Sequence, residues 1–221
     1  MTLVIHPRRF KIYRKPSPEE TRLLEQQLKE TNLLDNDFVL LVGGILLSLC
    51  AGQYHRHHAD IDLAIFETDI SRFYALAKRN GYTVTERIAT GHFSPLHDFS
   101  FVRPLPADRM MNSKHTRVIR HLKPFMVADR STFLDVFVYV VNGAFVEVPR
   151  YNLRFPKERV FPILRKNLPS GLTANLPNPL HIFDIKRADR RAVNLQDLRS
   201  YAALEHAVLA TQSSSSQKAA T

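Results

Sequence analysis

Two carboxylates stand two positions apart, Asp60 and Asp62, at the start of the apolar run 60–66. On a strand, side chains two residues apart project from the same face. These carboxylates would therefore lie roughly 6 to 7 Å apart, with Ile61 turned to the other face. Like charges at that spacing repel each other unless a cation or a shared proton intervenes. Hard oxygen ligands of this kind suit Mg²⁺ or Mn²⁺, which bind one or two carboxylates together with substrate phosphates.

A third carboxylate, Asp135, lies in the strand-like run 132–141, which is apolar on both faces. Burying an unpaired carboxylate there would cost on the order of several kcal/mol. A metal ion shared with Asp60 and Asp62 would compensate this charge, and so would an arginine in a structural ion pair. The sequence leaves both explanations open.

Two glycines and an arginine precede the paired carboxylates in the chain. Gly43 and Gly44 follow the apolar run 38–42 and permit a tight turn into a short helix. Arg56, in the next loop, would either contact a phosphate or remain a solvated loop arginine. A pair of aspartates alone is weak evidence, because surface strands often carry one. Together with the glycine pair and Asp135, it favours a metal site.

The same loop also offers zinc as an alternative metal. It contains His55, His57 and His58, but their spacing matches no familiar zinc site, and adjacent histidines point apart. Zinc is therefore disfavoured. The candidates for a general base are His97, Asp98 and Asp135.

The order of these features resembles the nucleotidyltransferase superfamily: a glycine pair, fifteen residues, Asp60-Ile61-Asp62 and a distant strand carboxylate. The resemblance covers roughly residues 38 to 205, most strongly 43–63. It implies that Gly43 and Gly44 make backbone contacts with the phosphates of a nucleotide. It also implies that the three acids Asp60, Asp62 and Asp135 hold two divalent ions.

Two branches of this superfamily match different parts of the chain. The stretch AGQYHRHHADIDLAI is similar to the G-R-x-T-R-x-H-x-D-I-D-L run of aminoglycoside and lincosamide nucleotidyltransferases. Arg56 and His58 match that run, whereas Gln53, His55 and Ile45 depart from it. The stretches LDVFVYVVNG and FPKERVFPILRKNLPSGLTANLPNPL resemble the hairpin and the P-N-P sequence of fukutin and bacterial phosphocholine transferases. That branch usually carries a tryptophan, and this chain has none.

Both branches imply that a hydroxyl attacks the phosphorus of an activated nucleotide with the help of two metal ions. The first implies the function that we expect: transfer of a nucleoside monophosphate from a nucleoside triphosphate such as ATP to a hydroxyl of a small-molecule acceptor. The second implies transfer of a phospho-alcohol from a CDP-linked donor to a glycan. A third alternative is an RNA- or protein-directed nucleotidyltransferase, or an inactive relative that binds nucleic acid.

Local patterns indicate the elements that would position these residues. Ser17-Pro18-Glu19-Glu20 predicts a helix start with a capping box, and 69–80 predicts an amphipathic helix ended by Gly81. The runs that predict strands are 38–42, 60–66, 82–87, 99–102, 122–128, 132–141 and 144–148. We expect 122–128 and 132–141 to pair as a hairpin, and 104–123 to be an irregular, basic insertion.

These elements indicate an α/β protein with a nucleotidyltransferase-like mixed β-sheet flanked by helices. Residues 1–149 would form the catalytic core. Residues 150–211, punctuated by prolines, would wrap the sheet and end in a helix. Residues 212–221 are of low complexity and would form a disordered tail.

Composition limits the class of protein. The chain of 221 residues carries 31 Lys and Arg against 21 Asp and Glu, and its net charge of +10 would attract polyanions such as nucleotides or nucleic acid. The longest apolar run, 38–50, is too short to span a bilayer. The N-terminus lacks a signal-peptide pattern, and the single cysteine, Cys50, excludes an internal disulfide framework. These features predict a cytoplasmic protein.

Overall fold

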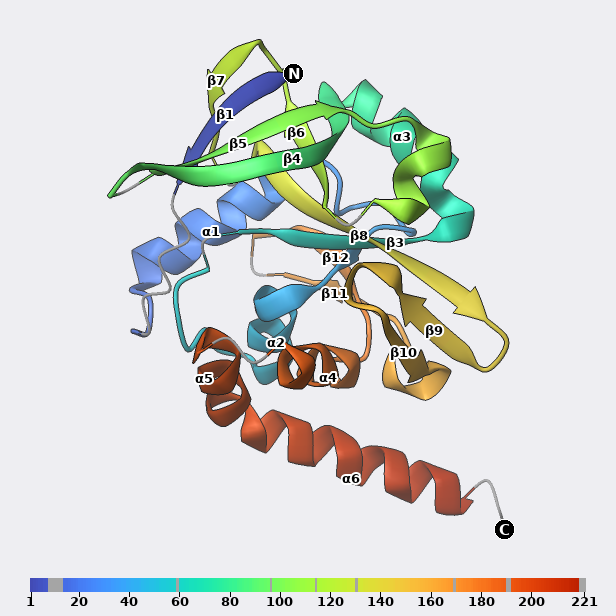
Figure 1. Ribbon diagram of the computed structural model, residues 1–221. Helices are drawn as coiled ribbons and strands as arrows, with labels where there is room; N and C mark the ends of the chain where they lie inside the picture. Colours follow the sequence, from blue (N-terminus) through green and yellow to red (C-terminus); the bar gives the residue numbers. More distant parts are fainter. Residues whose placement is uncertain are drawn as a thin grey trace.

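The computed structural model describes residues 1–7, 14–58, 60–95, 97–113, 115–129, 131–168, 170–189 and 192–218. A mixed sheet of twelve strands forms its centre, and helices flank the sheet (Figure 1). The expected α/β class with a mixed, helix-flanked sheet is therefore confirmed.

The sheet brings together strands from the whole length of the chain. The strands are β1 (Thr2–Pro7), β2 (Leu40–Leu41), β3 (Asp62–Phe66), β4 (Tyr82–Ser94), β5 (His97–Pro104), β6 (Thr116–Arg120), β7 (Phe125–Val127), β8 (Phe133–Asn142), β9 (Phe145–Val148), β10 (Leu153–Pro156), β11 (Leu164–Asn167) and β12 (Thr173–Leu176). Their order is β11-β12-β2-β3-β8-β6-β4-β5-β1-β7, with β9 pairing with β8 and β10 with β9. The central strands β3 and β8 are parallel, and their register sets Asp62 opposite Asp135.

Helices cover both sides of the central strands. They are α1 (Pro18–Glu30), α2 (Gly43–Ala51), α3 (Ile70–Arg79), α4 (Leu180–Ala188), α5 (Ala192–Ser200) and α6 (Ala202–Lys218), with 3₁₀ turns at Glu67–Asp69, Ala107–Asn112, Pro149–Tyr151 and Lys157–Arg159. In Figure 1, α2, α4, α5 and α6 gather on one side of β3 and β8, and α3 lies on the other. The group around α2 and α4 therefore faces the sheet where the carboxylates lie.

The helix α1 begins where the sequence predicts a helix start. Ser17 Oγ accepts a hydrogen bond from the backbone N–H of Glu20 at 3.2 Å, and the Glu20 carboxylate accepts one from the backbone N–H of Ser17 at 2.8 Å. This reciprocal pair is the expected capping box. The α1 face that carries Leu24 and Leu28 packs into the core, so the cap and the apolar stripe act on the same helix.

The central part of the chain corrects two expectations. Residues 116–120 are not an irregular insertion, because they form β6 between β4 and β8. Val118 and Ile119 are fully buried, one on each face of the strand. The expected hairpin is also wrong, because β7 pairs in parallel with β1 rather than with β8. A strand pairs with whichever edge the fold places beside it, and a short local pattern does not contain that information.

The C-terminal extension is part of the same sheet. Its short strands fit the proline spacing, and β12 joins the sheet in parallel beside β2. One hydrophobic core contains residues from both sides of the expected boundary at 149, including Leu63 and Phe183. The helix α6 continues to Lys218, past residue 212, where we expected disorder to begin. Adding a residue to a formed helix costs far less than nucleating one. Residues 219–221 lie outside the described part of the chain.

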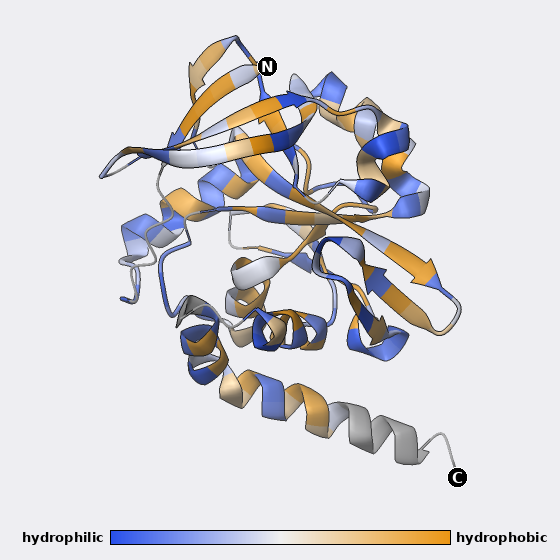
Figure 2. Ribbon diagram, viewed as in Figure 1, coloured by the Kyte–Doolittle hydropathy of each residue, from blue (hydrophilic) through white to orange (hydrophobic). Residues whose placement is uncertain are grey.

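Apolar residues concentrate in the strands at the centre of the molecule, whereas α1, α3 and α5 carry polar outer faces (Figure 2). Within the described residues, none of the helices has the length and apolar character needed to cross a membrane.

Candidate active site

The three aspartates that the sequence singled out converge in space. One carboxylate oxygen from each of Asp60, Asp62 and Asp135 lies within 4.8 Å of those of the other two. The parallel register of β3 and β8 brings Asp62 beside Asp135. Ile61, between the first two acids, is fully buried, so alternation puts Asp60 and Asp62 on the same side of the chain. We call these three residues the acidic trio.

Asp135 is also held by an arginine. The carboxylate is 2% exposed, and its Oδ1 accepts a hydrogen bond of 2.6 Å from Nε of the buried Arg117. Arg117 donates a second bond from Nη1 to Ser100 Oγ at 2.9 Å and lies over the ring of Phe133. The sequence left a metal ion and an arginine as alternatives, and the structure combines a carboxylate cluster with an arginine. Hydrogen bonds of this kind fix the orientation of metal-ligating side chains.

The donor set of the acidic trio fits a hard divalent cation. Three carboxylates offer oxygen ligands only, which suit Mg²⁺ or Mn²⁺ better than softer metals. By contrast, none of the histidines of the preceding loop joins a group of three or more potential ligand residues in the part of the chain that the structure describes. Burial, and then the cation of Arg56, lowers the pKa of His58 to about 3. His58 accordingly forms a structural contact, with its Nε2 2.9 Å from Ser48 Oγ.

The glycine turn lies directly against Asp62. Gly43 has φ +70°, and a Cβ atom there would stand 2.2 Å from Asp62 Oδ2. A Cβ on Gly44 would stand 2.5 Å from Nη2 of Arg56. Only glycines permit this close approach. The turn begins α2, and the free amides and dipole of a helix N-terminus favour bound anions.

The glycine turn and the acidic trio line one cavity. The rest of its lining combines aromatic and aliphatic side chains with charged and polar ones. The remaining lining residues are Val42, Arg56, Phe137, Tyr139, Arg150, Tyr151, Ile182, Ile185, Lys186, Asp189 and Asn194. The C-terminal extension therefore supplies part of this cavity through α4 and the chain that follows it.

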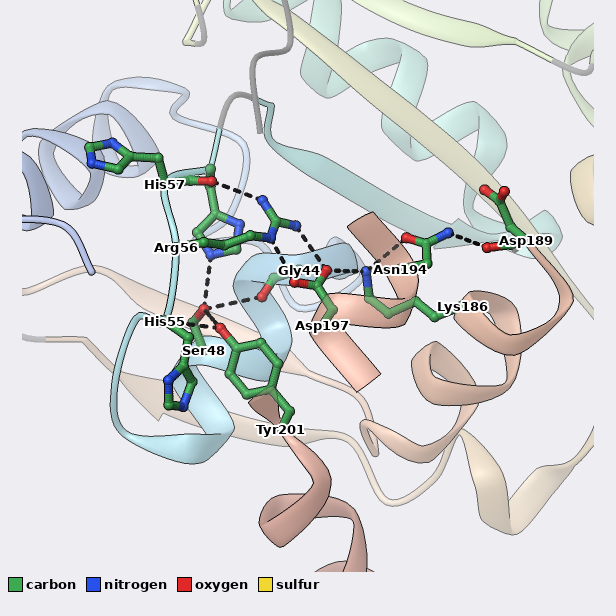
Figure 3. Close-up of polar contacts among 11 residues, drawn as sticks. Gly44, Ser48, His55, Arg56, His57, Lys186, Asp189, Asn194, Asp197 and Tyr201 are labelled. Atoms are coloured by element: carbon green, nitrogen blue, oxygen red, sulfur yellow. Dashed lines mark hydrogen bonds and ion pairs between the residues drawn. The ribbon is translucent and has the colours of Figure 1, made fainter. Parts of the chain in front are cut away.

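Arg56 is the centre of a buried ionic network (Figure 3). Its Nε and Nη2 donate to the two carboxylate oxygens of Asp197 at 2.7 and 3.1 Å, and Lys186 Nζ donates to Asp197 at 2.6 Å. Arg56 is 7% exposed, so the solvated-loop interpretation is wrong. Its contact with a phosphate stays a prediction. Burial alone would raise the pKa of Asp197, but the bonds from Arg56 and Lys186 outweigh it and hold that pKa below its usual value.

Among the charged residues around the site, sequence reasoning missed four that pair with a predicted residue directly or through Asp197. These are Arg117, Arg150, Lys186 and Asp197. For Arg117 a weak signal existed, since a carboxylate in an apolar strand requires a cation somewhere. The other three belong to the C-terminal extension, and no spacing rule connects them with residues 43–62.

Comparisons with known proteins add only a weak structural likeness. No family model matches the chain, and no curated protein matches it. Among solved structures, the chain is similar to the crystal structure of ANT(2″)-Ia in complex with adenylyl-2″-tobramycin. The TM-score is 0.45 and the identity 14%, over 89% of this chain and 99% of that chain. This likeness is too weak to define a shared fold or a shared activity.

Proposed function

We propose that this protein is a metal-dependent nucleotidyltransferase that moves a nucleoside monophosphate from a nucleoside triphosphate to a hydroxyl of a small-molecule acceptor. The convergence of the acidic trio beside the glycine turn carries this proposal. Carboxylates suited to divalent cations and backbone amides suited to phosphates line the same cavity. A nucleoside triphosphate with its divalent cation matches both groups at once.

Each part of the site then has a distinct role. Asp60, Asp62 and Asp135 hold Mg²⁺ or Mn²⁺, which when bound would activate the attacking hydroxyl and stabilise charge on the leaving phosphate. Gly43 and Gly44 bind the phosphate chain through their backbone. Because Asp62 lies directly against the glycine turn, we place the triphosphate on the Asp62 side and the acceptor hydroxyl on the Asp135 side.

The alternatives lead to different products. Transfer from a CDP-linked donor to a glycan would release CMP, whereas nucleotidyl transfer releases pyrophosphate. That alternative, and those directed at RNA or protein, remain predictions of the sequence. We therefore expect assays with Mg²⁺ and each nucleoside triphosphate or CDP-linked donor to yield pyrophosphate rather than CMP.

The decisive variants are Asp60→Asn and Asp135→Asn, with the exposed Asp37→Asn as the matched control. We expect each trio variant to lower pyrophosphate release about 10³-fold, a loss of about 4 kcal/mol of transition-state stabilisation. Titration with Mn²⁺, followed by electron paramagnetic resonance, gives an independent readout. Affinity for Mn²⁺ in the presence of nucleotide should fall at least tenfold in the trio variants only. Unchanged Mn²⁺ binding in Asp60→Asn would refute the proposal.

A further inference from the structure

A cluster of basic side chains borders the acidic trio on the side of Asp135. The backbone N–H of Arg87 donates to the carbonyl of His115 at 3.1 Å, and Arg87 Nη2 lies 3.0 Å from both ring nitrogens of His115. Arg150 approaches from the turn after β9, and its Nη2 lies 3.9 Å from Asp135 Oδ2. We call Arg87, His115 and Arg150 the basic cluster.

Arg150 is held differently from the structural Arg117. Arg117 forms two short hydrogen bonds with protein side chains. Arg150 lies over the rings of Phe137 and Tyr151, 4.4 and 5.8 Å from their centroids, and its distance to Asp135 is too long for a hydrogen bond. Its Nη1 is buried with no hydrogen-bond partner among the described residues. A buried donor of this kind is destabilising until it gains an acceptor.

The surroundings of Arg150 favour an anion in the cavity. Arg150 lines the cavity together with Asp135 and Phe137. Burial, then the cations of Arg87 and Arg150, lowers the pKa of the neighbouring His115 to about 4. His115 is thus neutral at neutral pH, so Arg87 and Arg150 carry the positive charge of this cluster. The glycine turn contacts Asp62 instead, so the two groups that attract anions border different carboxylates.

We propose that the acceptor is a small hydroxyl compound that carries an anionic group, a phosphate or a carboxylate, and that Arg150 binds this group. The inference rests on the proposed function. A guanidinium matches both anions with two parallel hydrogen bonds, and its stacking on Phe137 sets its plane. In the reaction, the acceptor oxygen bonds to the α-phosphorus, the bond from that phosphorus to pyrophosphate breaks, and the hydroxyl proton passes to water. A cationic group placed against Arg150 would be repelled by the guanidinium.

The first test measures anion binding without turnover. Inorganic phosphate is titrated by calorimetry into protein saturated with Mg²⁺ and pyrophosphate, which occupy the nucleotide side. The matched control for Arg150→Gln is Arg154→Gln. Arg154 also lies over an aromatic ring, Phe145, with a long ion pair of 3.7 Å, but it is exposed and outside the cavity. We expect Arg150→Gln to weaken phosphate binding at least tenfold and Arg154→Gln to leave it unchanged. Equal affinities in both variants overturn the proposal.

The second test compares acceptor classes in the pyrophosphate assay. A hexose phosphate, a hexuronate, the uncharged hexose and an aminoglycoside are supplied in turn. We expect kcat/KM to be at least tenfold higher for one of the two anionic compounds, and the better of them identifies phosphate or carboxylate. Arg150→Gln should raise the acceptor KM at least tenfold and leave the KM of the triphosphate within about twofold.

The outcomes separate this inference from the function on which it rests. Equal or better use of the uncharged hexose or the aminoglycoside overturns the anionic acceptor but leaves nucleotidyl transfer intact. An RNA oligonucleotide is supplied as a fifth acceptor, and preference for it over all four compounds overturns the small-molecule acceptor. Failure of the acidic trio to bind Mn²⁺ refutes the proposed function itself, whatever Arg150 binds.

Discussion

The two oxygens of the Asp135 carboxylate have different surroundings. Oδ1 accepts the short hydrogen bond from Arg117, and Oδ2 faces Arg150 across 3.9 Å. A carboxylate that is 2% exposed needs such compensation, because desolvating an isolated charge costs several kcal/mol. Arg117 therefore fixes the orientation of the carboxylate through Oδ1, which leaves Oδ2 on the side of Arg150.

A substitution of Gly43 tests whether the close contact between the glycine turn and Asp62 is needed for metal binding. Gly43→Ala and Gly52→Ala both place a side chain at φ +70°, which costs about 1–2 kcal/mol. Gly52 has no atom within 4 Å of its Cβ position, whereas at Gly43 the new Cβ would collide with Asp62. We expect Gly43→Ala alone to weaken Mn²⁺ affinity, at least tenfold, by displacing Asp62. Similar Mn²⁺ affinities in the two variants would show that the contact is irrelevant to the site.

At the scale of elements, the loop before β3 is secured by helices from the other end of the chain. Arg56 in that loop and Lys186 of α4 share the carboxylate of Asp197 in α5 (Figure 3). Ser48 of α2 lies 2.6 Å from the hydroxyl of Tyr201, between α5 and α6. The helix α2 begins at the glycine turn, and the loop with Arg56 leads into β3. These contacts therefore fix the position of the turn relative to the acidic trio.

The network predicts an unequal effect of two aspartate substitutions on stability. Asp197→Asn leaves Arg56 and Lys186 as buried cations with weakened partners, so the free energy of unfolding should fall by about 3–5 kcal/mol. Asp184→Asn removes a carboxylate that also pairs with two arginines but is about a quarter exposed, and should cost at most about 1 kcal/mol. Urea denaturation of both variants measures the difference. Equal losses would mean that the buried network does not stabilise the fold.

At the scale of the whole molecule, the candidate site depends on both ends of the chain. The acidic trio and the glycine turn precede residue 136, whereas Arg150, Lys186 and Asn194 complete the cavity from the C-terminal extension. That extension also contributes β12 to the sheet and Phe183 to the core. The cavity is therefore complete only when the extension is packed against the sheet.

Global stability should depend on pH through a buried histidine in that extension. His181 is fully buried, with Nε2 2.9 Å from the Tyr139 hydroxyl, and burial lowers its pKa to about 4. The unfolded chain binds the proton near pH 6.5. Its contribution to stability is therefore complete above that pH and is lost as the pH falls towards 4, by about 3 kcal/mol.

Urea denaturation at pH 7 and pH 4 measures this loss. His181→Gln should flatten the pH dependence of the unfolding free energy, whereas the same substitution at the exposed His92 should not. If His181→Gln retains the full pH dependence of the wild type, the loss arises elsewhere.

Short-range chemistry in the sequence determined several features correctly. The capping box of α1 depends on Ser17 and Glu20, three residues apart, and the shared face of Asp60 and Asp62 depends on strand alternation. The burial of Asp135 in an apolar strand required compensation whatever the fold. Each of these follows from residues within a few positions of one another, so the local pattern contains the information.

Only the tertiary structure decided which partners these residues meet. Arg117 lies 18 residues from Asp135, and Arg56 lies 141 residues from Asp197. Strand register and helix packing select such partners among many similar arginines and aspartates. For the same reason β6 was predicted as a basic loop. The charge of Arg117 is typical of a loop, but in the sheet Arg117 lies opposite Asp135, which neutralises it. Pairing across the sheet is a property of the assembled fold, and a charge that is neutralised there cannot be distinguished in the sequence from one that is solvated.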